Sequence, residues 1–336
     1  MATGRRGAFT FTLTFAGKCL TLRPKRQIQN RKGLTGMKRI ASVCVLALGV
    51  AACGDGNPFT DTGGGTGGGT GANTINGTAL NADLTANSVV FDDNGTADPS
   101  DDTLVINNLP FDNSDTTGGG YTNAGALPNG FQRFESPVLG TAGELRYFAV
   151  FRETNFARVT AVGTGDFVEA GFGGVFAERI GGGGVPAGRA ASYTFTGDYA
   201  AVRIGTANGG TNDVQFVTGD AVLTADILDF DTNGAVGGFI SNRELFASDG
   251  TSLGPLNDFI SLANADIDFD TATIDSSTAS TQENGAALGT GNWQGIFAGP
   301  NGEEIAGIVV IEGSKTAAEP TDTVRETGTF IVVNGG

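Results

Sequence analysis

Short hydrophobic runs alternate with turn-forming residues from about residue 79 to the C-terminus. β-Branched and aromatic residues gather in these runs, Gly, Asn and Asp separate them, and apolar residues at helical spacing are scarce. Regularly spaced short strands of this kind are typical of a β-sandwich or a β-barrel. The runs that we expect to form strands are 103–106, 146–151, 192–204, 215–217, 221–228, 259–269, 292–298, 304–312 and 329–333.

One of these runs alternates strictly between apolar and polar residues. In 263–270, Ala, Ala, Ile and Phe occupy every second position, and one Asn and three Asp residues lie between them. Since successive side chains of a strand point to opposite faces, this pattern predicts one wall of a packed interior, with the aspartates in water.

The stretch 291–307 predicts a β-hairpin. Trp293, Gly295 and Phe297 share one face of the first strand, and the gap at Gly295 could accept a neighbouring ring. Pro300 sets φ for a turn, and the Asn301-Gly302 pair supplies positions that tolerate left-handed φ. The residues that would line one face of the returning strand are Ile305, Gly307, Val309 and Ile311.

The N-terminal region has the pattern of a secretory signal. Met37, Lys38 and Arg39 form a short basic start, and 40–52 is an apolar run that ends in small residues. As a helix this run would be about 20 Å long, short of the roughly 30 Å hydrocarbon core, so it predicts a signal peptide rather than a permanent span. Its end resembles the bacterial lipobox, which implies lipidation at Cys53. The alternative is an ordinary signal peptide with an incidental cysteine.

The predicted signal divides the chain into segments. We interpret 1–36 as a start-site artefact, with translation beginning at Met37, and an unusually long basic n-region is the alternative. Residues 37–52 would be the lipoprotein signal peptide, and 53–78, rich in Gly and Thr, a flexible tether behind the lipidated cysteine. We expect an accessory β-segment in 79–185, ending in the glycine linker 181–184, and the barrel in 186–336.

Charge and composition exclude several functions. The ten Lys and Arg residues before Cys53 have no acidic counterpart, so the chain from Cys53 onward has ten basic and 36 acidic residues and a net charge of −26. Such a surface repels nucleic acid and anionic headgroups. The chain has no histidine, which excludes Ser-His-Asp catalysis and the usual zinc sites. Cys53 would be the single cysteine after processing, so no intrachain disulfide is expected.

The hairpin 291–307 resembles the C-terminal barrel signature of the transferrin-binding protein B-like surface lipoproteins. Residues 193–199 resemble that family's opening barrel strand and 328–330 its closing strand. The resemblance spans roughly 190–336 and implies an all-β fold, an eight-stranded antiparallel β-barrel preceded by a smaller accessory β-segment. Type members have two lobes, and 79–189 is long enough for only one accessory segment. The residues that match the signature are Trp293, Gly295, Phe297, Gly299, Pro300, Glu304, Ile305 and Gly307.

One weak candidate for a calcium site can be identified in the sequence. Asp229, Asp231 and Asn233 have the spacing of the first half of a calcium loop, in which alternate oxygens bind one ion. The twelfth loop position should be a bidentate Glu and is Ile240, so we favour a hairpin turn with Asn233 and Gly234 at its tip. The acidic stretch 92–102 is expected to be a solvated loop. No cofactor is expected.

The function predicted from these features is non-catalytic. The chain would be a lipoprotein of the cell envelope, anchored to the outer membrane by lipid on Cys53, on its surface or its periplasmic face. It would bind an extracellular macromolecule or a metal-carrying solute, such as a protein or an iron carrier, through barrel loops. The alternative is a structural or adhesin-like envelope lipoprotein with no soluble ligand. A glycosidase built on two carboxylates is a third hypothesis, but no pair stands out.

Overall fold

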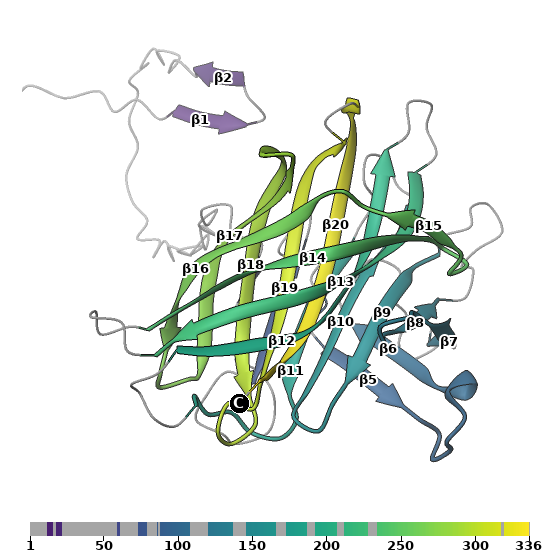
Figure 1. Ribbon diagram of the computed structural model, residues 1–336. Helices are drawn as coiled ribbons and strands as arrows, with labels where there is room; N and C mark the ends of the chain where they lie inside the picture. Colours follow the sequence, from purple (N-terminus) through teal and green to yellow (C-terminus); the bar gives the residue numbers. More distant parts are fainter. Residues whose placement is uncertain are drawn as a thin grey trace, which may run out of the picture. The chain divides into compact units, whose positions relative to one another are not determined.

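The computed structural model has two units, residues 1–52 and 53–336, which are described separately (Figure 1). The first unit contains one hairpin, formed by β1 (Thr12–Phe15) and β2 (Lys18–Thr21). The other strands lie in the second unit. The residues that the structure describes are 12–15, 18–21, 59–60, 73–78, 86, 88–107, 120–136, 146–165, 173–186, 192–206, 212–227, 234–316 and 319–335.

Eight long strands form a closed antiparallel barrel, which confirms the predicted fold class. Each strand pairs with its neighbour along the chain, and the last pairs with the first, from Phe195 opposite Asn334 to Gly205 opposite Val324. The short strand β15 (Ser252–Pro255) pairs with the C-terminal end of β14. The barrel strands are β12 (Ser192–Thr206), β13 (Asn212–Asp226), β14 (Ala235–Ala247), β16 (Phe259–Asp268), β17 (Thr273–Glu283), β18 (Ala286–Ala298), β19 (Glu304–Thr316) and β20 (Glu319–Asn334).

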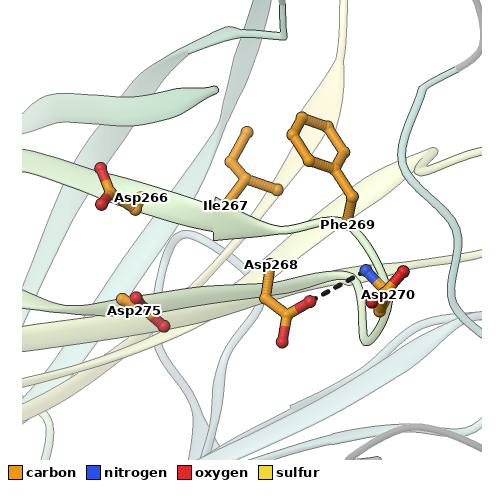
Figure 2. Close-up of a pocket in the computed structure, with 6 residues that line it drawn as sticks. All are labelled: Asp266, Ile267, Asp268, Phe269, Asp270 and Asp275. Atoms are coloured by element: carbon orange, nitrogen blue, oxygen red, sulfur yellow. Dashed lines mark hydrogen bonds between the residues drawn. The ribbon is translucent and has the colours of Figure 1, made fainter. Parts of the chain in front are cut away.

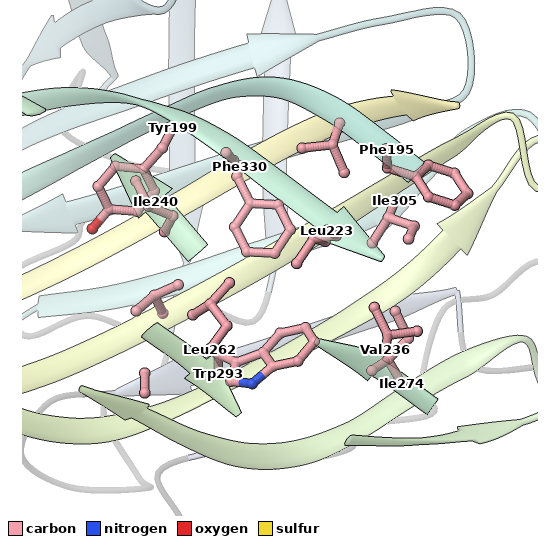
Figure 3. Close-up of a cluster of buried hydrophobic side chains, with 14 of the residues drawn as sticks. Phe195, Tyr199, Leu223, Val236, Ile240, Leu262, Ile274, Trp293, Ile305 and Phe330 are labelled. Atoms are coloured by element: carbon pink, nitrogen blue, oxygen red, sulfur yellow. The ribbon is translucent and has the colours of Figure 1, made fainter. Parts of the chain in front are cut away.

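The alternation of side chains fills the barrel interior. On β12, Tyr199 and Ala201 belong to the interior cluster, while the intervening Ala200 and Val202 face outward. Figure 3 shows the aromatic and aliphatic side chains that meet inside. Two of the rings lie over glycines, and a Cβ on Gly307 would come within 2.1 Å of the Phe330 ring. Only glycine leaves room for such a ring, because any side chain would occupy the same space.

The predicted hairpin is formed by β18 and β19. Trp293 lies opposite Val309, and Gly295 lies opposite Gly307. The space beside Gly295 is filled by an aliphatic group rather than a ring, because Cδ1 of Ile274 lies 3.0 Å from the position that a Cβ would take. The tryptophan and its strand neighbours therefore belong to the barrel core.

The turn of this hairpin differs in one position from the prediction. Gly299 and Gly302 have positive φ, +85° and +66°, but Asn301 is not among the residues with positive φ. The backbone N–H and the side-chain amide of Asn301 instead donate to the carboxylate of Glu303, at 2.9 and 2.8 Å. Two glycines supply the left-handed positions, so the asparagine is free to act as a hydrogen-bond donor.

The alternation predicted for 263–270 holds from Ala265 onward and fails at Ala263. Ala265 and Ile267 are buried and the three aspartates are exposed, but Ala263 is exposed as well. Leu262 and Ala265 both belong to the interior cluster although they are three residues apart, so the strand is irregular between them. The carbonyl oxygen of Ala263 accepts a hydrogen bond from Nε1 of Trp293 at 2.9 Å. The irregularity therefore satisfies the buried indole N–H.

The substitution Trp293→Phe should destabilise the protein by about 1–3 kcal/mol, because the Ala263 carbonyl loses its donor and the smaller ring leaves a gap. The measurement is the free energy of unfolding in a denaturant titration. Phe259→Leu, at a side chain of β16 that is 43% exposed, is the control and should change the value by less than about 0.5 kcal/mol. Equal effects of the two substitutions would contradict the assigned role of Trp293.

A second antiparallel sheet precedes the barrel. The chain runs through it from β5 to β11, and β4 lies next to β11 at the opposite end from β5. One 3-10 turn, Pro99–Asp101, lies between β5 and β6. Since β4 belongs to this sheet, the sheet begins before residue 79, in a stretch where Ile75 is the single apolar residue of the strand. The strands are β3 (Phe59–Thr60), β4 (Thr74–Thr78), β5 (Ser88–Asp92), β6 (Thr103–Asn107), β7 (Tyr121–Ala126), β8 (Gln132–Glu135), β9 (Phe148–Glu153), β10 (Ala157–Gly163) and β11 (Gly173–Arg179).

This curled sheet, the half-barrel, is buried on both faces along β9, β10 and β11, whereas Val90 of β5 is exposed. One face holds an aromatic cluster in which the rings of Phe91 and Phe151 stack at 4.7 Å. The other face packs against the outer wall of the barrel and forms one continuous apolar cluster with it. Outward-facing barrel residues in this seam include Val202, Ile204, Phe216, Ile296, Ile308, Val310 and Ile331.

Polar contacts fix the half-barrel on the barrel at the edges of the seam. Nε of Arg179 donates to the carbonyl oxygen of Phe297 at 2.6 Å, and its NH2 group donates to that of Ala272. Burial lowers the pKa of Arg179 to about 10. Thr154 donates to the carboxylate of Glu304 at 2.6 Å. The two sheets are therefore held in register by directional bonds as well as by apolar contact.

Within the part of the chain that the structure describes, no helix has the length and apolar character needed to cross a membrane.

Candidate functional site

The site residues predicted from the sequence lie outside the described residues. Cys53, Asp229, Asp231 and Asn233 all belong to this group, so their roles stay predictions. The strands that flank the predicted calcium loop are described, and their pairing ends at Asp226 opposite Ala235. Eight residues, 227–234, separate this last pair. The Asn-Gly pair is thus next to β14 and not in the middle of the connection, as a two-residue turn would require.

The interior of the barrel is filled and contains a buried ionic cluster toward one end. Arg243 of β14 is 1% exposed, and its two NH groups donate to the carboxylates of Asp258 and Glu326. The hydroxyl of Tyr199 donates to Oε1 of Glu326 at 2.6 Å. Arg203, which pairs with Glu326 across β12 and β20, brings a second guanidinium to the cluster. Two cations and two carboxylates balance here, so the cluster closes the interior rather than leaving a charged site for a ligand.

Titration of this cluster is governed by burial and by the guanidinium groups. Burial alone would lower the pKa of Arg243, but the carboxylates of Glu326 and Asp258 raise it above its usual value. Burial alone would raise the pKa of Glu326, but the charges of Arg243 and Arg203 outweigh burial, and the pKa is lowered. At Asp258 the burial effect prevails, and the pKa is raised. The cluster is therefore a stability element that depends on Arg243.

A surface pocket of about 360 Å³ lies at the tip of the β16–β17 hairpin, at the opposite end of the barrel from the ionic cluster. Figure 2 shows Ile267 and Phe269 projecting on one side of β16 and Asp268 on the other. Asp268 accepts hydrogen bonds from the N–H groups of Asp270 and Thr271, at 2.9 and 3.2 Å, which hold the turn. The lining residues are Asp266, Ile267, Asp268, Phe269, Asp270 and Asp275.

The pocket is acidic and has an aromatic side chain at its edge. Burial raises the pKa of Asp275, and the charges of Asp266 and Asp268 raise it further. Hydrogen bonds from Thr271 and Asp270 lower the pKa of Asp268. Carboxylates placed this close together favour a cationic group over a neutral or anionic one. The pocket can therefore attract positive charge, and Phe269 offers apolar contact beside it.

The carboxylates of the described residues do not form a metal centre. No group of three or more His, Cys, Asp or Glu side chains among them is arranged to hold a metal ion. Asp229, Asp231 and Asn233 lie outside these residues, and the twelfth position of their loop pattern is Ile240 rather than a bidentate Glu, so we expect calcium and a chelator to leave the melting temperature unchanged. The test is a melting curve with calcium, with chelator and without either. A strong calcium-dependent shift that Asp231→Ala abolishes would contradict the predicted turn and establish a calcium loop.

Two further motifs from the sequence are structural. In the linker 181–184, Gly183 forms a parallel bridge with Gly299, and the N–H of Gly184 donates to the carbonyl oxygen of Gly299 at 3.0 Å. The linker is thus bonded to the turn of the β18–β19 hairpin. The acidic stretch 92–102 is exposed from Asp92 to Asp101, as predicted, but Asp102 at its end is buried. Its carboxylates accept local N–H groups, for example Asp92 from Asn94 at 2.9 Å.

The ionic cluster and the acidic pocket were not identified from the sequence. A signal for the cluster exists, because Arg243 is the single basic residue between Ile204 and Lys315. The sequence predicts that the aspartates of 263–270 lie on the solvent-exposed face of a strand. Their proximity to Asp275 depends on the pairing of β16 and β17, which the sequence does not give.

Comparison with protein-family models and with curated proteins gives no match. Among solved structures, the chain is similar to a surface lipoprotein, with 13% identity and a TM-score of 0.32 over 55% of this chain and 80% of that one. It is also similar to the vaccine antigen transferrin-binding protein B of Haemophilus parasuis, with 14% identity and a TM-score of 0.35 over 78% of this chain and 44% of that one. This chain thus spans less than half the length of that transferrin-binding protein. A surface lipoprotein and a transferrin-binding protein B are the kinds of protein that the hairpin 291–307 resembles.

Proposed function

We propose that this protein is a non-catalytic lipoprotein of the cell envelope, anchored by lipid on Cys53, that binds an extracellular protein or an iron-carrying solute through its barrel-end loops. The observation that carries the proposal is the filled barrel. Trp293, Phe330 and the Arg243 cluster occupy its interior, so a ligand has to bind outside. Barrel-end loops on a rigid scaffold are suited to this role.

The acidic pocket is the part of the loop surface at which we place ligand contact. Its carboxylates face water at the tip of the β16–β17 hairpin, and Phe269 lines the same pocket from the opposite side of the strand to Asp268. Aromatic side chains with a polar surrounding supply much of the energy of protein recognition. The predicted tether 53–78 would hold this surface away from the membrane.

The experiment is a capture assay with the full chain on beads, presented with iron-loaded transferrin and with conditioned growth medium, iron-replete and iron-limited. We expect one protein or iron-containing solute to be retained. The double variant Asp266→Asn and Asp275→Asn should weaken that retention by about tenfold. The matched control, Asp92→Asn with Asp93→Asn, removes two exposed charges from the half-barrel and should leave retention unchanged.

The outcome of the capture assay distinguishes a binding lipoprotein from a structural or adhesin-like one. If the full chain retains nothing under either iron condition, the binding proposal is wrong and the structural or adhesin-like lipoprotein takes its place. If both double variants bind as the unchanged chain does, a ligand exists but the acidic pocket is not its site.

A further inference from the structure

The outer wall of the barrel differs sharply between its two sides. On β18, β19 and β20 the outward-facing apolar residues are covered by the half-barrel. Outside the covered area, Phe239 of β14 is 44% exposed and Phe259 of β16 is 43% exposed, and Val333 near the end of β20 is 49% exposed. Two large aromatic side chains in water are costly to a soluble protein unless a partner covers them.

The strand register brings these side chains into one row. Val333 lies opposite Thr196, Thr196 opposite Val222, and Val222 opposite Phe239, across β20, β12, β13 and β14. Phe239 in turn lies opposite Ser261 of β16, and Phe259 is two residues from Ser261 on the same face. At the usual spacing between strands the row is about 20 Å long. We name the patch formed by Val333, Val222, Phe239 and Phe259 the aromatic row.

The part of the wall formed by β13, β14 and β16, which carries Val222, Phe239 and Phe259, has one sign of charge. Between Ile204 and Ser314 the chain has sixteen Asp and Glu residues and a single basic residue, Arg243. Since Arg243 is buried inside the barrel and bonded to Asp258 and Glu326, it contributes no positive charge to the outer surface. Asp220 lies two residues from Val222 on β13, Asp266 lies opposite Ala235, four residues from Phe239, and both aspartates are exposed. The row is therefore an apolar centre with an acidic rim.

We propose that the aromatic row is the docking surface for a cationic protein segment that inserts apolar or aromatic side chains between Phe239 and Phe259. Charge complementarity selects this partner. A second copy of the chain would bring its own acidic wall and be repelled, and nucleic acid and anionic lipid are excluded on the same ground. The inference goes beyond the proposed function, because the row lies on the wall of the barrel and not in the barrel-end loops.

The test uses the full chain on beads and a displayed library of random peptides of about twenty residues, a length that reaches across the row. We expect the enriched peptides to carry net positive charge and apolar or aromatic residues. Their affinity should fall by about tenfold or more in the double variant Phe239→Ser with Phe259→Ser. It should also fall when salt is raised from about 0.05 M to about 0.5 M.

A matched control separates the row from exposed apolar surface in general. Val90 and Ile180 of the half-barrel are 56% and 38% exposed, and Val90→Ser with Ile180→Ser should leave the affinity unchanged. Unchanged melting temperatures of both double variants show that each is folded. The proposal is wrong if no peptide is enriched, if the enriched peptides are not cationic, or if they bind the Phe239 and Phe259 variant equally well. Binding to phosphatidylcholine vesicles that depends on the two phenylalanines would also overturn it, in favour of a lipid surface.

Discussion

A chain reduced to residues 186–336, the segment in which the sequence places the barrel, should fail to form a soluble, monomeric protein. Without the half-barrel, the outward-facing Val202, Ile204, Ile308 and others of the seam would be exposed to water. Exposing each such side chain costs about 1.5–3 kcal/mol of stability. The summed cost for the seven side chains of the seam is as large as the whole free energy of unfolding of a typical domain. The measurement is size-exclusion chromatography of the fragment with a thermal melt.

The matched control is a chain from Asn73 to Gly336, which keeps both sheets and should be monomeric with one cooperative transition. Adding residues 73–185 as a separate chain should restore solubility to the fragment, because the seam can re-form. A monomeric 186–336 fragment whose melting temperature lies within a few degrees of the control would show that the seam contributes little, contrary to this structure.

The substitution Arg243→Ala should destabilise the protein by about 3–5 kcal/mol, because it leaves Asp258 and Glu326 buried without the guanidinium that bonds to both of them. The matched control is Arg146→Ala, which removes the ion pair with Glu135 at 3.2 Å. That arginine side chain is 41% exposed, so its loss should change the free energy of unfolding by less than about 1 kcal/mol.

The pH dependence of the free energy of unfolding distinguishes loss of the buried ion pairs from simple loss of packing. In the unchanged protein the pKa of Glu326 is lowered. The carboxylate of Glu326 therefore stabilises the fold fully at pH values above the pKa that it has in the unfolded chain, and this stabilisation is lost as the pH falls through the pKa of the folded state. In Arg243→Ala the burial effect is no longer opposed by this guanidinium, and we expect the pKa of Glu326 to be raised. The destabilisation by the substitution should therefore shrink as the pH is lowered. A destabilisation that is constant from neutral to acidic pH would indicate that packing alone is lost.

The barrel could be predicted because its pattern is local. Alternation along 263–270, the glycine and aromatic spacing of 291–307 and the turn residues between runs each determine a strand or hairpin without knowledge of the rest. The failure at Asn301 is local too, whereas the failure at Ala263 depends on a residue thirty positions away. In each, a hydrogen bond prevailed over the simple pattern, from the Trp293 indole in one case and to the Glu303 carboxylate in the other.

The seam and the candidate sites could not be predicted in the same way, because they depend on long-range packing. In β10, for example, Ala157, Val159 and Ala161 alternate with Arg158 and Thr160, which indicates one buried face but does not identify the element that covers it. The aromatic row depends on register across five strands, and the acidic pocket depends on the pairing of two. The uniform acidity of 204–314 was visible in the sequence, but its contrast with an apolar row required the fold.

The lipid anchor at Cys53 is the central claim of the proposed function, and its most direct test is mass spectrometry of the N-terminal peptide of protein purified from membranes. We expect a peptide that begins at Cys53 and carries the added mass of a diacylglyceryl group, with residues 1–52 removed. Cys53→Ser should release the protein from the membrane fraction, because its single covalent lipid site is lost. An unmodified Cys53 inside a longer peptide, from protein that is still bound to membranes, would contradict the account.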